Sequence, residues 1–187
     1  CTYLGATFSG TITYTYTDAA VNNTCSLTAS GHSVARVPNF TITGPSGGSF
    51  AVSKTGSAGQ VITQTGASTY SFANDGIRRV LTYSGATLAD FTTSTTTAIG
   101  LTGVNRNGRV ASGGTLRVLN NLTSVSCDFS PSSVTWGSAC NCATSGTWTA
   151  SCSDGKSASL ALTSCGAGTF TYNGATQNVT LDQCSSN

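Results

Sequence analysis

The sequence predicts an all-β protein, an antiparallel β-sandwich or barrel-like fold of many short strands, stapled by disulfides, with little or no helix. Apolar and hydroxyl side chains alternate with period two in many short runs, which is typical of strands with one solvated face. Turn signals rich in Gly, Asn and Asp separate these runs at intervals of about ten residues. The chain has 33 Thr and 27 Ser but neither Glu nor Met, a composition that favours strands over helices.

The strongest strand signal lies over residues 6–17, where apolar residues alternate with Thr or Ser. One face of this predicted strand carries five uncharged residues: Phe8, Gly10, Ile12, Tyr14 and Tyr16. A second strand or strand pair is predicted over residues 25–37. We expect it to end at Pro38, because proline cannot donate a hydrogen bond to a β-ladder.

Short strands are also predicted across residues 39–83 and beside the later turns. For the Thr-rich run over residues 92–97, a weakly registered strand and an exposed loop both stay open. The dipeptide Gly113-Gly114 predicts a hairpin turn, as does the stretch of residues 105–108. One domain over residues 1–187 is favoured, because no Pro- or Ser-rich linker precedes the cysteine-rich sub-region of residues 126–187.

Eight cysteines, six of them within residues 127–184, predict a framework of disulfides. Two stretches share a cysteine, a small-residue spacer and a Gly-Thr-aromatic-Thr run, and a further cysteine closes each stretch. This bracketing predicts four local disulfides: Cys142–Cys152, Cys165–Cys184, Cys127–Cys140 and Cys1–Cys25. Disulfides require an oxidising compartment, so a secreted or cell-surface protein is expected.

Cys1 has a second interpretation, because a mature amino-terminal cysteine carries lipid in bacterial lipoproteins. The even number of cysteines favours a disulfide instead, and both fates stay open. The sequence begins without Met or an apolar leader, as expected of a mature exported form. No apolar run reaches 18 residues, so no helix is expected to span a membrane.

No metal or cofactor site is expected from the residues that usually form one. Cys140 and Cys142 form a C-x-C pair, whereas structural zinc sites use wider spacings, and His32 is the only histidine. Nucleic-acid binding is not expected either. The net charge of +2 is spread thinly, and the most basic stretch, residues 106–117, lacks stacking aromatics.

Catalysis is not expected from the motifs in the chain. Residues 44–48 match the G-x-S-x-G pattern, but that motif needs a helix after it, and a turn between two strands is predicted there. Glycosidases usually need two facing carboxylates. Three of the six Asp lie in or beside predicted turns, namely Asp75, Asp154 and Asp182, so a small secreted glycosidase remains the last alternative.

Aromatic residues on neighbouring predicted strands support another alternative, a secreted module that binds carbohydrate or a cell-surface receptor. These residues are Trp136, Trp148, Phe170 and Tyr172. Aromatic rows on strands serve as cross-strand core pairs more often than as binding platforms.

The leading interpretation is an exported, non-enzymatic structural protein that associates with copies of itself in an extracellular filament, pilus, sheath or similar assembly. In its low charge and its wealth of Thr, Ser, Gly and Ala, the chain resembles bacterial surface lipoproteins and pilus or filament subunits. The predicted contact is the strand over residues 6–17, through Phe8, Ile12, Tyr14 and Tyr16, because this strand lacks the Lys and Pro that commonly protect a sheet edge. A position in the centre of its own sheet is the competing prediction.

Overall fold

The computed structural model describes residues 2–3, 5–17, 27, 29–181 and 184, and every regular element in these residues is a β-strand. The strands are β1 (Thr2–Tyr3), β2 (Ala6–Tyr16), β3 (Ser33–Thr43), β4 (Ser49–Gly66), β5 (Thr69–Tyr83), β6 (Ala86–Thr97), β7 (Ile99–Thr102), β8 (Val110–Ser112), β9 (Thr115–Asn120), β10 (Val125–Trp136), β11 (Ala143–Cys152), β12 (Ser157–Ser164), β13 (Ala167–Tyr172) and β14 (Ala175–Thr180). All recorded strand pairings are antiparallel. The predicted all-β antiparallel class is therefore confirmed.

The strands form one 14-stranded sheet in which most strands that are consecutive along the chain pair with each other. Strand β5 pairs with β6 near one end and with β7 near the other, so β6 and β7 together line most of its length. In the same way, β9 and β8 together line β10. With each of these couples counted as one interrupted row, the fold is an up-and-down meander that begins at β1 and ends at β14.

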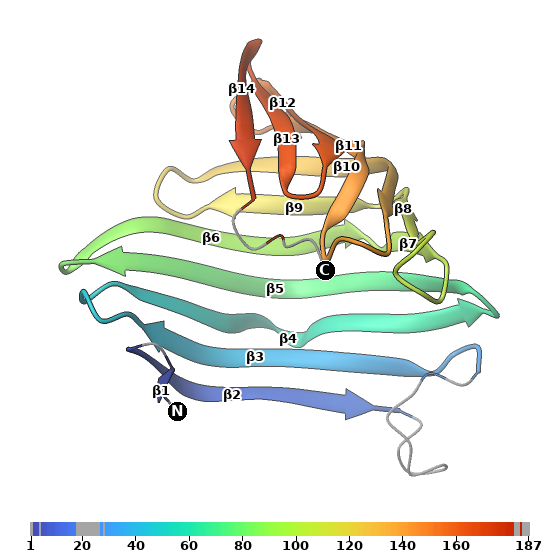
Figure 1. Ribbon diagram of the computed structural model, residues 1–187, viewed down its shortest axis with the longest axis horizontal. Helices are drawn as coiled ribbons and strands as arrows, with labels where there is room; N and C mark the ends of the chain where they lie inside the picture. The colour runs from blue at the N-terminus through green and yellow to red at the C-terminus, as the bar shows by residue number, and fades with distance from the viewer. Residues whose placement is uncertain (1, 4, 18–26, 28, 182–183, 185–187) are drawn as a thin grey trace.

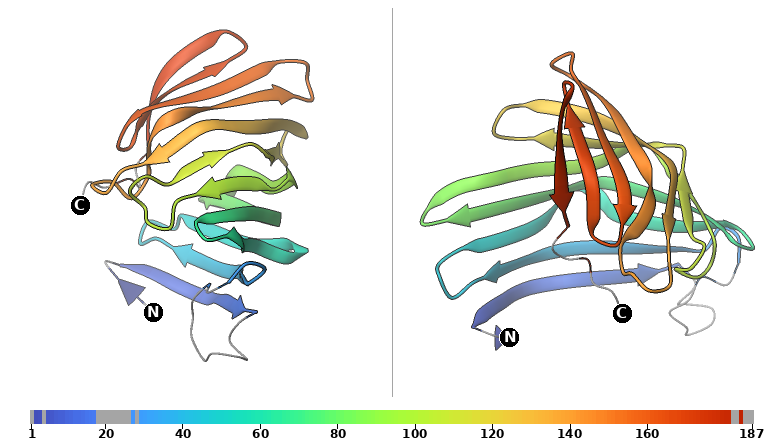
Figure 2. Two further views of the ribbon diagram at one scale, coloured as in Figure 1. Left: turned by 90° about the vertical axis from the view of Figure 1, so that its right-hand side faces the viewer. Right: turned by 45° about the horizontal axis from the view of Figure 1, so that its top comes forward.

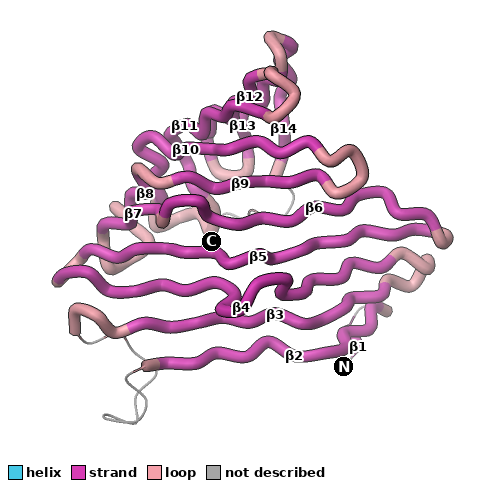
Figure 3. Tube along the Cα trace, turned by 180° about the vertical axis from the view of Figure 1, so that it is seen from behind, coloured by secondary structure: helices cyan, strands magenta, loops and turns pink. Residues whose placement is uncertain are grey.

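The sheet twists strongly along this order (Figure 1). Strands β2 to β5 run side by side across one end of the molecule, whereas β12 to β14 stand steeply against them and come forward when the molecule is turned (Figure 2). From behind, β2 to β6 lie open to view, and no described element covers them (Figure 3). Of the two forms predicted, the curled sheet is nearer to a barrel than to a sandwich, and it leaves two edges unjoined.

The core lies on one face of the sheet, where β7, β8, β10 and β12 curve together. Its most buried residues are Ile99, Ala111, Val134 and Leu162. Ala111 and Val134 are direct partners on β8 and β10, so their side chains point to the same side of the sheet. A second buried cluster on β11 and β12 consists of Ala150, Cys152 and Ala158.

Pro38 lies inside β3, so the prediction that a strand ends there is wrong. Pro38 faces Ile12 of β2 in an uninterrupted register. On the other side, the pairing of β3 with β4 is irregular between Arg36 and Asn39. The proline therefore sits where the ladder already breaks, which is where a missing N–H is tolerated.

Gly113-Gly114 is not the predicted hairpin turn, because β8 and β9, on either side of it, both pair with β10. Gly114 has a φ of +73°, and a Cβ built on it would lie 2.2 Å from the carbonyl oxygen of Ala98. Glycine is required for this close approach between two interrupted rows. The Thr-rich run of residues 92–97 belongs to β6, which decides for the strand over the loop.

Six of the predicted disulfide cysteines are bonded to one another, but none of the three local pairings predicted for them is right. The bonds are Cys127–Cys152, Cys140–Cys165 and Cys142–Cys184. Cys1 and Cys25 lie outside the described residues.

Strand length explains why the local pairings fail. Cys142 precedes β11 and Cys152 ends it, so an extended strand holds them about 30 Å apart, far beyond the ~7 Å that a disulfide spans. In the same way, Cys127 lies near the start of β10 and Cys140 follows its end. Cys127 instead bonds the residue directly opposite it on the neighbouring strand.

The other failed pairing, Cys165–Cys184, has a different explanation. Cys165 lies between β12 and β13, and Cys184 follows β14, at the same end of the sheet. A Cβ built on Gly166 would lie 3.0 Å from that of Cys184. These cysteines are close, yet each bonds a cysteine that precedes β11, so the start of β11 is tied both to the turn between β12 and β13 and to the chain after β14.

Candidate functional site

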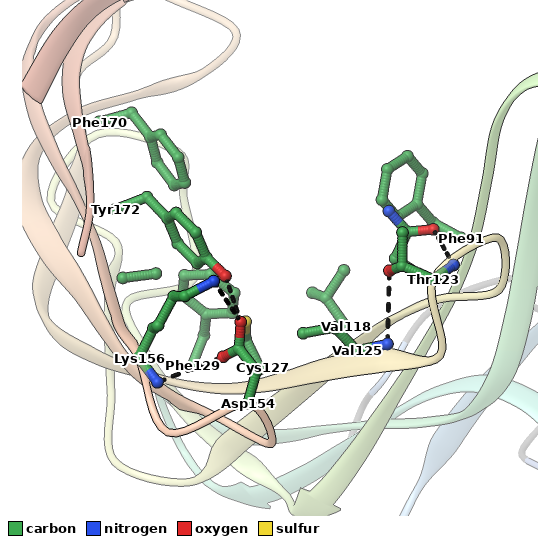
Figure 4. Close-up of a pocket in the computed structure, with 12 residues that line it drawn as sticks. Phe91, Val118, Thr123, Val125, Cys127, Phe129, Asp154, Lys156, Phe170 and Tyr172 are labelled. Carbon is green, nitrogen blue, oxygen red and sulfur yellow. Dashed lines mark hydrogen bonds and ion pairs between the residues drawn. The ribbon is translucent and has the colours of Figure 1, made fainter. Parts of the chain in front are cut away.

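A groove of about 500 Å³ opens on the core side of the curled sheet (Figure 4). Phe170 and Tyr172 form one wall, Phe91 lies opposite them, and Val118 and Val125 lie between. The remaining lining residues are Asn120, Thr123, Cys127, Phe129, Asp154, Lys156 and Ala158.

The sheet register builds the apolar surface of this groove. Directly opposite residues on antiparallel strands point to the same face, and so does every second residue along each strand. Phe129 of β10 faces Leu116 of β9, and Leu160 of β12 faces Phe170 of β13. A hollow of about 250 Å³ continues the groove along these rows, with an entirely apolar lining of Leu116, Val118, Phe129, Trp148, Leu160 and Phe170.

The polar lining residues are Asn120, at the end of β9, and others that come from turns. Thr123 lies between β9 and β10, while Asp154 and Lys156 lie between β11 and β12. The strands themselves contribute mainly carbon to the groove. It therefore provides apolar contacts along its length and polar groups at the end where these turns lie.

Asp154 organises those polar groups. Its Oδ2 accepts a hydrogen bond of 2.6 Å from the Tyr172 hydroxyl and lies 3.0 Å from Lys156 Nζ. The hydrogen bond from Tyr172, followed by that from Lys156, lowers the pKa of Asp154 from 3.8 to about 2. The same contacts raise the pKa of Tyr172 and of Lys156. The carboxylate and the ammonium neutralise each other, so the groove carries no net charge from them.

The predicted aromatic row is partly present in the groove. Trp148, Phe170 and Tyr172 line the groove or its continuation, whereas Trp136 packs against the core cluster around Val134 instead. The sequence interpretation did not include Phe91 and Phe129. Both lie in runs with period-two alternation, but which strand lies beside which was not available from that pattern.

The other candidate catalytic residues have local structural roles or lie outside the described part. Asp75 accepts hydrogen bonds from the backbone N–H groups of Ser57 and Ala58 and from the Ser57 hydroxyl, which together lower its pKa. The turn over residues 44–48 joins β3 to β4, so no helix follows it. Asp182 lies outside the described residues.

Among the residues that the structure describes, no group of three or more His, Cys, Asp or Glu side chains is arranged to hold a metal ion. No described helix is long and apolar enough to cross a membrane.

Strand β2 lies at one edge of the sheet, which excludes the central position that the sequence left open. Within the described residues, only β1 pairs with its outer side, and it reaches only Ala6 and Thr7. Thr17 donates its backbone N–H to the carbonyl of Ser33 on the β3 side. Because hydrogen bonding alternates along an antiparallel pair, the even-numbered residues of β2 direct their backbone groups outward.

The outward groups belong to the residues predicted as the contact, Phe8, Ile12, Tyr14 and Tyr16, and to Gly10. The Tyr14 residue is 55% exposed. No residue of β2 is charged or proline.

No protein-family model, curated protein or solved structure matches this chain.

Proposed function

We propose that the protein is an exported, non-enzymatic structural subunit, and that copies associate through the outer edge of β2 in an extracellular filament, pilus, sheath or similar assembly. The observation that carries this proposal is the edge itself. Beyond Phe8, no described residue pairs with the outer side of this 11-residue strand, which contains no charged residue and no proline. Natural sheets commonly protect such an edge with Lys, Pro, a bulge or a covering element.

The chemistry of an added strand fits this edge. A strand from another subunit would pair with the outward N–H and C=O groups of β2, and main-chain hydrogen bonds would supply much of the affinity. Charge does not oppose such contact, since the chain has a net charge of only +2. The three disulfides are consistent with an extracellular location.

Exposed apolar side chains beside the edge add to the contact. Tyr14 of β2 is 55% exposed and Ile42 of β3 is 36% exposed. Ile42 faces Phe8 across the β2–β3 pair, and the ring of Phe8 stacks on Phe40 at 5.1 Å. A second subunit at this edge would remove part of this apolar surface from water, which favours association.

Replacing Tyr14 with proline tests the edge directly. Tyr14→Pro removes an outward N–H without removing a hydrogen bond between β2 and β3, because Tyr14 is even-numbered. We expect the association constant to fall about tenfold or more, because one intersubunit hydrogen bond is lost and the proline ring obstructs the interface. Light scattering across a dilution series measures this association.

Tyr14→Ala is the matched control, because it removes the same aromatic ring but keeps the N–H. It should associate more strongly than Tyr14→Pro. Equal association of the two variants would argue against backbone pairing at β2. A wild-type protein that stays monomeric at high concentration, or a chain without residues 1–17 that still assembles, would refute the proposed function.

The groove favours a second candidate function, a secreted module that binds a small, uncharged and largely apolar molecule. A carbohydrate fits less well, because sugar hydroxyls need polar partners along the site and the strands of the groove contribute few. Asp154 already accepts hydrogen bonds at both oxygens, from Tyr172 and Lys156.

A neutral naphthylamine dye that fluoresces in apolar surroundings tests this second function. We expect wild-type protein to bind the dye with quenching of tryptophan emission, since Trp148 lies in the continuation of the groove. Phe170→Ala should weaken binding about tenfold, equivalent to ~1.4 kcal/mol of lost apolar contact. Leu81→Ala is the control, because Leu81 is 41% exposed and does not line the groove. Equal losses in both variants would count against a groove site.

A further inference from the structure

We infer that the partner of the β2 edge is β14 of a second copy, so that subunits join head to tail into one continuous sheet. This inference rests on the proposed function, and it adds which surface meets β2. It follows from the other end of the meander, where β14 has β13 as its one described neighbour in the sheet.

Strand β14 presents the same kind of edge as β2. Its sequence, ATQNVT, contains no charged residue and no proline, and all of its residues except Val179 are exposed. Leu181 donates its N–H to the carbonyl of Gly166 in the same register that pairs β14 with β13. The backbone N–H and C=O groups of the odd-numbered residues of β14 therefore point toward β13. Those of Thr176, Asn178 and Thr180 point outward, away from the sheet.

The positions of the two edges determine whether association stops at a dimer or continues to a polymer. Strands β2 and β14 lie at opposite ends of the sheet order, and Figure 1 shows them far apart in the molecule. A contact between two β2 edges uses the same surface twice and stops at a dimer. A contact between β2 and β14 leaves one edge of each kind free at the ends of every complex, so growth continues.

The absence of charged residues from both strands also permits this contact. Neither strand brings a charged side chain to the other, so no like charges meet and no ion must be desolvated. The side chains of Thr176 and Asn178 on one face of β14 are small and polar, as are the Thr side chains on one face of β2. The second copy is therefore an occupant that the chemistry of the edge accepts.

Two edge-blocked variants of the full-length protein test the inference. Tyr14→Pro blocks β2, and Asn178→Pro blocks β14 at an outward-facing N–H. Asn178→Ala is the matched control, because it also loses the hydrogen bond from Thr169 Oγ1 to the Asn178 side chain. Each proline variant should keep the far-ultraviolet spectrum of its alanine control, and light scattering then gives the mass of each sample alone and of an equimolar mixture.

Head-to-tail joining predicts that each proline variant alone is monomeric and that the mixture forms complexes of two subunits, one of each variant. If Asn178→Pro forms dimers by itself and the mixture contains nothing else but free Tyr14→Pro, β2 pairs with β2; the inference then fails while the proposed function stands. If wild-type protein and both alanine controls are also monomeric, the proposed function fails. A proline variant that loses its strand spectrum is replaced by lysine at the same position, with the same expected masses.

Discussion

Replacing Cys142 and Cys184 together with serine lowers the free energy of unfolding by about 4 kcal/mol, the largest loss that we expect from any single crosslink. The bond closes a loop with a sequence separation of 42 residues, against 25 for each of the other two. In the chain-entropy model the stabilisation grows with loop length, and the shorter loops correspond to about 3.5 kcal/mol each. Urea titration of the oxidised proteins, followed by tryptophan fluorescence, measures the loss.

The same cysteines allow a control for connectivity. Cys152→Ser should expose one titratable thiol, that of Cys127, because Cys127 is the partner of Cys152. Peptide mapping without reduction then assigns the thiol. A free thiol at Cys142 would contradict the bond network, and an unchanged urea midpoint in the double serine variant would contradict the stabilisation.

Acid removes stability between about pH 4 and pH 2, through four aspartates with lowered pKa values. The pKa of Asp90 is lowered from 3.8 to about 2, chiefly because Arg78 donates hydrogen bonds of 2.9 Å and 2.5 Å to its two carboxylate oxygens. Asn121 donates a further hydrogen bond of 2.7 Å. The pKa of Asp154 is also lowered to about 2. The pKa values of Asp75 and Asp128 are lowered by their hydrogen bonds, from the residue 57–58 backbone and Ser57 hydroxyl in the first case and from Arg117 in the second.

The sign of the effect follows from these directions. A carboxyl group with a lower pKa in the folded state binds protons more readily when unfolded, so its contribution is complete above the unfolded value near 3.8 and is lost as the pH falls through the folded value. Thermal melting at pH 5, 4, 3 and 2 should show a flat region followed by a steep fall. Asp90→Asn should melt lower at pH 5 and show a shallower fall. Parallel curves for the variant and wild type would exclude Asp90 from the acid transition.

The sequence was sufficient for the class of the fold and for the faces of its strands. In β2, the alternation of apolar and hydroxyl residues correctly grouped Phe8, Ile12, Tyr14 and Tyr16, because period two is a local property of extended chain. The same alternation did not determine whether β2 lies at an edge. That position depends on which strands pair elsewhere, and no residue within β2 records it.

The disulfides fail as a prediction for a related reason. A cysteine beside a strand is separated from the cysteine at its other end by the length of that strand, while its bonding partner lies across the sheet. Cys127 and Cys152 show this most clearly, because they are far apart in sequence and directly opposite in register. Local bracketing measures distance along the chain, and pairing requires distance between strands.

The groove could be predicted from the sequence only in part. Trp148, Phe170 and Tyr172 could be grouped from neighbouring hairpins, since β11 to β14 follow one another closely. Phe91 joins them only because the sheet curls, which brings β6 opposite β13. Curvature accumulates over many strand pairs, so it has no signal within a short window of sequence.

The meander order also shapes how the chain acquires its structure. Each row of the sheet pairs with the row before it, as neighbouring repeats do in a solenoid. Folding can therefore proceed strand by strand, because each new strand pairs with one that has already formed. Contacts between adjacent rows need only short loops to close, which keeps the entropic barrier of each step low for a β-protein. The bonds Cys140–Cys165 and Cys142–Cys184 join the start of β11 to residues that follow β12 and β14, so in this order of folding they form late.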